Sequence, residues 1–177
     1  DIITKMKIYV LGVCGTFMGG LAQLAVQKGF EVAGCDENAY PPMSNVLAEQ
    51  GIKVDQGFSA RNIADDIDLF VIGNVVSRGN PMMEEILKRR LKFVSGPQFL
   101  TESILEDRHV IAVSGTHGKT STSSMLAKVL IDAGLDIGYM IAGRAIDLDS
   151  TAYLGTHKYF VIEADEYDTA FFDKRSK

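Results

Sequence analysis

Short apolar runs alternate with amphipathic stretches along the first 107 residues. Each run ends at a glycine or a polar residue, which is typical of a buried strand. The runs predict four strands: residues 7–11, 31–35, 69–72 and 92–95. Between them, apolar residues such as Leu21, Leu24 and Ala25 recur at the spacing of one helix face. This alternation predicts a parallel sheet covered on both faces, a Rossmann-like α/β fold.

Glycine, proline and serine residues predict where the helices begin and end. Gly29 ends the first helix, because glycine readily adopts the left-handed backbone found at helix C-termini. Ser44 is predicted to cap a helix that runs to about Gln50, since its hydroxyl can accept a hydrogen bond from the first amides. Pro81 begins another helix, and a further one runs through Leu105.

A second strand, glycine loop and helix follow the polar residues Glu106-Asp107-Arg108. We expect three strands in this part: residues 109–113, 137–141 and 159–162. The polar stretch predicts a boundary between a domain of residues 1–107 and the first part of a second α/β domain in residues 108–177. Two or three strands leave a sheet with an open edge, so we expect the chain to be the N-terminal part of a longer protein.

Composition narrows the class of protein further. Hydrophobic residues make up 46% of the 177 positions and charged residues 23%, as in ordinary soluble domains. A net charge of −5 with no basic stripe argues against a nucleic-acid partner. Apolar runs are far shorter than a membrane span, and the start lacks the pattern of a signal peptide. Cys14 and Cys35 lack metal-ligand spacing, so we interpret them as reduced thiols in a cytoplasmic protein.

The stretch from Ser114 to Thr120 has the composition of a nucleotide-phosphate loop. Its glycines let backbone amides converge on phosphate oxygens, and Lys119 can reach the β- and γ-phosphates. Thr120 supplies a hydroxyl for Mg²⁺, and the following helix presents the positive end of its dipole. Val113 stands where the usual Walker pattern has its first glycine. A chance glycine-rich turn is the alternative interpretation.

The predicted ATP-binding residues are consecutive: Gly115, Thr116, His117, Gly118, Lys119, Thr120 and Ser121. His117 could approach a phosphate or a metal-bound water, or it could only shape the loop. We favour the loop-shaping role for His117.

An acidic cluster follows the last predicted strand. Glu163 stands at the end of that strand, where ligands of parallel sheets gather, so we assign it a Mg²⁺-binding role. Asp165, Glu166 and Asp168 could orient a substrate or a second ion. A solvated acidic turn is the alternative.

A first glycine loop, residues 12–20, also joins a strand to a helix. A dinucleotide fingerprint would have glycine at Cys14 and at Phe17, so a nicotinamide or flavin site is only partly matched. Asp36 occupies the place of a ribose-binding acid, and backbone amides of the loop could bind a diphosphate. Cys14 is a weak candidate nucleophile, because no histidine lies in this half of the chain. The polar loop at residues 73–81 could line the same crevice or form a plain turn.

The two glycine loops in series, followed by Glu-Ala-Asp-Glu-Tyr-Asp, resemble the Mur ligase family over essentially all 177 residues. Its members are cytoplasmic, ATP-dependent enzymes that form amide bonds in peptidoglycan metabolism. The resemblance implies ATP and Mg²⁺ as cofactors, and UDP-N-acetylmuramate with a murein tripeptide as substrates. It makes residues 1–107 the UDP-sugar-binding domain and residues 108–177 the start of the ATP-binding domain.

Four stretches are similar to the members that recycle a tripeptide rather than add L-alanine: residues 12–20, 40–44, 95–99 and 171–177. Addition of L-alanine remains the alternative, although those members usually have glycine where Cys14 and Phe17 stand. The resemblance makes Lys119 and Glu163 catalytic, and Thr120 and Glu163 metal ligands. It implies this set of UDP-sugar contacts: Gly12, Gly15, Thr16, Phe17, Met18, Asp36, Asn74 and Ser77.

Two functions from other classes also fit parts of the chain. A dinucleotide-dependent oxidoreductase would use the first glycine loop, but the imperfect fingerprint and the intact phosphate loop argue against it. The chain could also bind a UDP-sugar without any activity of its own, since its second domain is expected to be incomplete.

Overall fold

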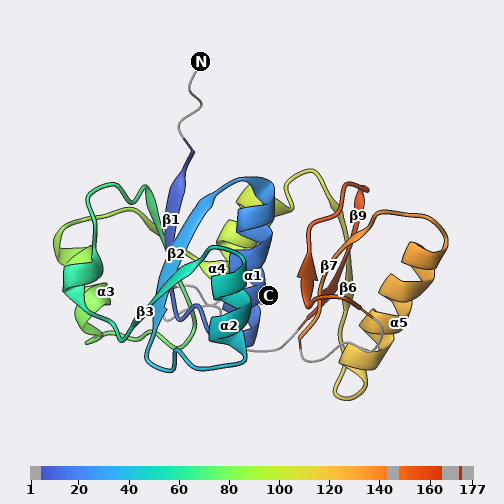
Figure 1. Ribbon diagram of the computed structural model, residues 1–177, viewed down its shortest axis with the longest axis horizontal. Coiled ribbons are helices and arrows are strands. Elements are labelled where there is room, and N and C mark those ends of the chain that lie inside the picture. The colour runs from blue at the N-terminus through green and yellow to red at the C-terminus, as the bar shows by residue number, and fades with distance from the viewer. Residues whose placement is uncertain (1–4, 143–147, 165–171, 173–177) are drawn as a thin grey trace.

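A computed structural model describes residues 5–142, 148–164 and 172 of the chain, which form two sheets side by side (Figure 1). The first sheet is wholly parallel, in the order β3-β2-β1-β4-β5. Its strands are β1 (Lys7–Leu11), β2 (Glu31–Asp36), β3 (Lys53–Gln56), β4 (Leu69–Ile72) and β5 (Phe93–Ser95). The second sheet has the order β6-β9-β7-β8, and only the β7–β8 pair is antiparallel. Its strands are β6 (His109–Val113), β7 (Gly138–Met140), β8 (Ala152–Tyr153) and β9 (Tyr159–Glu163).

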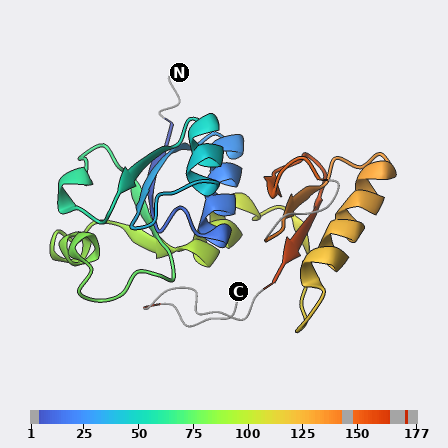
Figure 2. The ribbon, with the colours of Figure 1, turned by 60° about the horizontal axis from the view of Figure 1, so that its bottom comes forward.

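Helices cover both faces of the first sheet, and a further helix lies against the face of the second sheet that is turned away from the first (Figures 1 and 2). The α-helices are α1 (Thr16–Lys28), α2 (Met43–Glu49), α3 (Pro81–Lys88), α4 (Gly96–Phe99) and α5 (Lys119–Asp132). Two shorter segments are η1 (Ala60–Asn62) and η2 (Leu100–Ile104). No helix in the described part of the chain is long and apolar enough to cross a bilayer.

Alternate residues of each central strand face two different layers. In β1, Ile8 and Val10 pack in the cluster that contains α1, whereas Tyr9 and Leu11 pack in the cluster that contains α3. This two-sided burial explains why the central strands are continuous apolar runs. The predicted Rossmann-like parallel fold is therefore confirmed, and so are the seven predicted strands, with small shifts at their ends.

Three features of the fold differ from the sequence predictions. Strand β3 was not predicted, because its residues alternate between charged, apolar and amide side chains at a sheet edge. Strand β8 was also not predicted, because it has only two residues. The predicted cap at Ser44 is wrong: α2 begins at Met43 after Pro42, and no side chain caps it.

Helix α1 lies between the two sheets and is buried along most of its length. Eight consecutive residues, Met18 to Ala25, are buried. Met140, Ala152 and Phe160 of the second sheet belong to the same apolar cluster as α1. The two sheets are consequently joined through one apolar cluster, while each also packs a further cluster on its other face.

The turn between β8 and β9 is held by the carboxylate of Asp136. It accepts hydrogen bonds from the Thr156 amide (3.0 Å), the Thr156 hydroxyl (2.8 Å) and the Tyr153 hydroxyl (2.8 Å). These bonds, led by that of the Thr156 hydroxyl, lower the pKa of Asp136 below its ordinary value.

The lowered pKa predicts a pH-dependent stability. The contribution of Asp136 is fully present above the unfolded pKa of about 3.9 and is lost as pH falls through the lower folded pKa. We expect Asp136→Asn to melt below the parent protein at pH 7, with the difference shrinking below about pH 4. Thermal melts between pH 7 and pH 3 measure it, with Asp107→Asn as an exposed-carboxylate control. A difference that stayed constant down to pH 3 would contradict the assignment.

Candidate functional site

The phosphate loop, residues 114–118, joins the end of β6 to the start of α5 and is exposed throughout. Gly118 caps α5 with φ of 75°, a left-handed conformation that glycine adopts without a Cβ clash. Within the described part of the chain, the amides of Gly115, Thr116 and His117 donate to no acceptor. Together with the positive end of the α5 dipole, these amides form a site suited to an anion.

Thr120 and Glu163 meet directly beside this loop. The Thr120 hydroxyl donates to the Glu163 carboxylate, at 2.9 and 3.0 Å from its two oxygens. The Ala142 amide also donates to that carboxylate, at 3.0 Å. Parallel pairing places Glu163 beside Val113, the last residue before the phosphate loop. The end of β9 thus brings an acid to the first turn of α5.

The donor atoms of Thr120 and Glu163 fit a small hard cation. Mg²⁺ is held in nucleotide sites by one or two protein oxygens, with water and phosphate oxygens as its other ligands. The described residues contain no cluster of three or more histidine, cysteine or acidic side chains, so a larger protein cage is not formed among them. Asp165, Glu166 and Asp168 lie outside the described residues.

The amides of the first glycine loop are largely engaged within the protein. Gly12 and Val13 both donate to the Cys35 carbonyl, at 2.8 and 3.1 Å, and the Cys14 amide donates to the Asp36 carboxylate at 3.0 Å. Asp36 is only 7% exposed and also accepts from the Asn38 amide at 3.0 Å. Asp36 therefore braces the loop, and the ligand contact expected at its position stays a prediction.

The remaining UDP-sugar candidates differ in their access to a ligand. The Gly12 amide donates to the Cys35 carbonyl, and the φ of 83° at Gly12 favours glycine there. Met18 is 4% exposed and packs in the core, so a ligand could meet only its backbone. Thr16 is exposed and Phe17 half-buried at the start of α1, where helix amides favour an anion. Gly15 precedes them as the helix cap.

Asn74 and Ser77 are exposed in the loop that follows β4. Strands β1 and β4 are neighbours, and the strand order reverses between them. Ligands of open parallel sheets bind at such a reversal, outside the carboxyl ends of the strands. The structure therefore brings this loop beside the first glycine loop, and the ligand contacts of Asn74 and Ser77 stay predictions.

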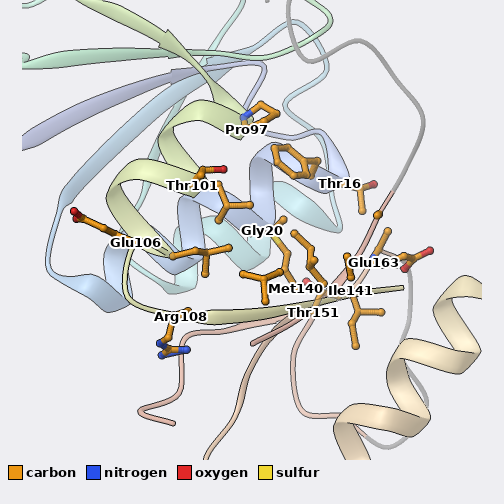
Figure 3. Close-up of a pocket in the computed structure, with 18 residues that line it drawn as sticks. Thr16, Gly20, Pro97, Thr101, Glu106, Arg108, Met140, Ile141, Thr151 and Glu163 are labelled. Carbon is orange, nitrogen blue, oxygen red and sulfur yellow. Dashed lines mark hydrogen bonds between the residues drawn. The ribbon is translucent and has the colours of Figure 1, made fainter. Parts of the chain in front are cut away.

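A cavity of about 530 Å³ lies between α1, the α4–η2 segment and the second sheet (Figure 3). Thr16 and Gly20 line it from α1, Thr101 from η2, and Met140 and Glu163 from the second sheet. The cavity thus extends from the start of α1 to the acid beside the phosphate loop. Sequence patterns did not predict that η2 and β7 line a cavity. Leu100 and Met140, which line it from these elements, are apolar residues typical of an ordinary core.

The chain has a Rossmann-like sheet, followed by a strand, a glycine loop and a helix, with an acid on the strand that neighbours this strand in its sheet. These features define a phosphate-loop α/β protein. Residues 7–108 match the family model described as "Mur ligase family, catalytic domain". The chain belongs to the Mur ligase family, as its sequence motifs predicted.

Several known proteins resemble the chain closely. It is 52% identical over 172 residues to the UDP-N-acetylmuramate–L-alanyl-γ-D-glutamyl-meso-2,6-diaminoheptandioate ligase of Escherichia coli strain K12. It is also 52% identical over 170 residues to the ligase of the same name from Haemophilus influenzae. These matches cover 97% and 96% of the chain, but the chain spans only 38% of the length of each relative.

A solved structure of a similarly named ligase also matches the chain. The crystal structure of the UDP-N-acetylmuramate:L-alanyl-γ-D-glutamyl-meso-diaminopimelate ligase from Neisseria meningitides superposes with a TM-score of 0.94 at 49% identity. The match covers 98% of this chain and 56% of that chain.

Burial raises the pKa of the Cys14 thiol to about 11, and the nearby Asp36 charge adds to the shift. The reactive species is the thiolate, so we expect iodoacetamide to modify Cys14 about 100-fold more slowly at pH 8 than a free cysteine. Mass spectrometry of the Cys14 peptide against time measures the rate, which should rise steadily up to pH 10. A rate at pH 8 equal to that of free cysteine would contradict the buried environment.

Proposed function

We propose that the chain is part of an ATP-dependent ligase that joins L-alanyl-γ-D-glutamyl-meso-diaminopimelate to UDP-N-acetylmuramate. The observation that carries the proposal is the phosphate loop with Thr120 and Glu163 in contact, in a chain that is 52% identical to ligases named for this reaction. Its substrates include ATP and a UDP-sugar, so we place the protein in the cytoplasm.

Residues 1–107 would bind the UDP-sugar, and residues 108–177 would form the first part of the ATP-binding domain. The diphosphate of the sugar would meet the start of α1 at Thr16 and Phe17, because the amides of Gly12 to Cys14 are already engaged. Asn74 and Ser77 would contact the sugar nucleotide from the neighbouring loop. The cavity between Thr16 and Glu163 gives the sugar a route from the first loop to the phosphate loop.

ATP would be bound by residues 115–121. The amides of Gly115, Thr116 and His117 would hold phosphate oxygens, and His117 would chiefly shape the loop. Lys119 would neutralise charge on the β- and γ-phosphates. Thr120 and Glu163 would hold Mg²⁺, which when bound offsets negative charge on the transferring phosphate.

The proposed reaction has two steps. The lactyl carboxylate of UDP-N-acetylmuramate attacks the γ-phosphorus of ATP, the bond from that phosphorus to the bridging oxygen breaks, and ADP leaves. The tripeptide amine then attacks the acyl phosphate, phosphate leaves, and an amide forms with loss of the amine proton. The protein needs no covalent nucleophile, because its work is positioning and charge neutralisation by Lys119 and the loop amides.

Replacement of Lys119 tests the role of the phosphate loop. In the full-length protein, we expect Lys119→Ala to lower kcat for tripeptide-dependent ADP release by about 100- to 1,000-fold, since a preorganised charge is lost. Lys128→Ala is the matched control, because Lys128 lies on the same helix in an exposed pair with Asp132 and should change kcat less than twofold. Ligation by Lys119→Ala near the parental rate would overturn the assignment.

A competition assay tests the choice of substrate. The full-length protein, given ATP and UDP-N-acetylmuramate, is offered equal amounts of L-alanine and the tripeptide, and the products are separated by mass. We expect the tripeptide product to dominate, since the relatives at 52% identity are named for that reaction. Predominant L-alanine addition would replace this function with the alternative one, and absence of both products would refute ligation.

A further inference from the structure

The side chain of Gln27, at the end of α1, forms hydrogen bonds with the edge of the second sheet. Its amide nitrogen donates to the Ala152 carbonyl at 3.2 Å, and its amide oxygen accepts from the Leu154 amide at 2.6 Å. A side-chain amide that pairs with both a carbonyl and an amide of one strand acts as an additional strand partner. The pairing connects α1, which belongs to the first sheet, to β8 of the second.

The segment to which Gln27 is bonded, residues 152–154, is held in place by further contacts. The Arg108 guanidinium donates to the carbonyl oxygens of Leu154 and Gly155 and lies 5.8 Å from the centre of the Phe160 ring. The Asp136 carboxylate accepts hydrogen bonds from the amide and the hydroxyl of the next residue, Thr156, and from the Tyr153 hydroxyl. Gln27 is therefore bonded to a fixed part of the second sheet and not to a loose loop.

Helix α1 also touches the second sheet near its middle. A Cβ at Gly20 would lie 3.0 Å from the Met140 sulfur and 3.7 Å from the Ala152 Cβ, so the absence of a side chain allows this close contact. Figure 3 shows Gly20 and Met140 facing each other at the cavity. Helix α1 thus contacts the second sheet at two points, Gly20 and Gln27. Two separate contacts oppose a tilt of the helix against that sheet.

A tilt of α1 would move its first turn relative to the phosphate loop. Thr16 lies four residues before Gly20, about 6 Å along the helix at about 1.5 Å per residue. A tilt of about 10° about Gly20 would therefore move Thr16 by about 1 Å relative to the second sheet, which carries Glu163 and the phosphate loop. A displacement of that size between reacting groups can lower a rate by about 100-fold.

We propose that Gln27 is a positioning residue, which fixes the start of α1 relative to the phosphate loop by pairing with β8. The kinetic part of this inference rests on the proposed ligase function. Gln27 touches none of the proposed reacting groups, so its replacement should affect kcat and leave ligand binding intact.

The first test is kinetic and uses the full-length protein. Gln27→Met preserves helix propensity and side-chain length but removes both hydrogen bonds. We expect kcat to fall about 10- to 100-fold, while KM for ATP and for UDP-N-acetylmuramate stays within about twofold. The matched control is Gln50→Met, which removes the hydrogen bond from the Gln50 side-chain nitrogen to the Gln23 side-chain oxygen. That bond lies within the first sheet's layers, so kcat should stay within about twofold. Equal kcat losses in the two variants, or unchanged kcat in Gln27→Met, would overturn the proposal.

The second test does not depend on activity. Hydrogen exchange of the full-length protein should show the Leu154 amide exchanging about tenfold faster in Gln27→Met, with the β9 amides unchanged. Unchanged protection of Leu154 would overturn the proposed pairing. If the parent protein failed to ligate while Leu154 lost protection, the ligase function would fail and the structural pairing would stand.

Discussion

The structure depends on the burial of α1 between two sheets. A helix that is apolar on all sides must be covered on all sides, and α1 is covered by strands of the first sheet, by α2 and by Met140 and Ala152 of the second. Its single fully buried polar side chain, Gln23, is satisfied by Gln50 and by the Gly19 carbonyl. The same burial places the start of α1 and Glu163, the acid beside the phosphate loop, along one cavity.

The two glycine loops look alike in the sequence but differ in their free donors. In the first loop, Cys35 and Asp36 accept hydrogen bonds from Gly12, Val13 and Cys14, so the loop is braced by the neighbouring strand. In the phosphate loop, the described chain offers no acceptor to Gly115, Thr116 or His117. An anion thus finds its donors at the phosphate loop and, in the first sheet, at the start of α1.

Sequence reasoning succeeded where one residue type has one physical role. Pro81 begins α3 and Gly29 ends α1, because proline lacks an amide to leave unpaired and glycine adopts a φ of 108° without strain. It failed at Ser44: a cap there would start the helix at residue 45, but α2 begins two residues earlier, at Met43. It also missed β3, whose polar residues form a strand only because β2 provides a partner.

The sequence by itself determined the Rossmann-like fold, the family and the candidate chemistry of Lys119, Thr120 and Glu163. Strand periodicity and motif spacing involve residues close together in the chain, so they can be recognised from the sequence alone. Only the tertiary structure decided that Asp36 braces a loop and that Gln27 joins α1 to β8. Those roles depend on contacts between distant residues. The Asp36 contact spans 22 positions within the first sheet, and the Gln27 contact spans 127 positions and forms only because the two sheets pack together.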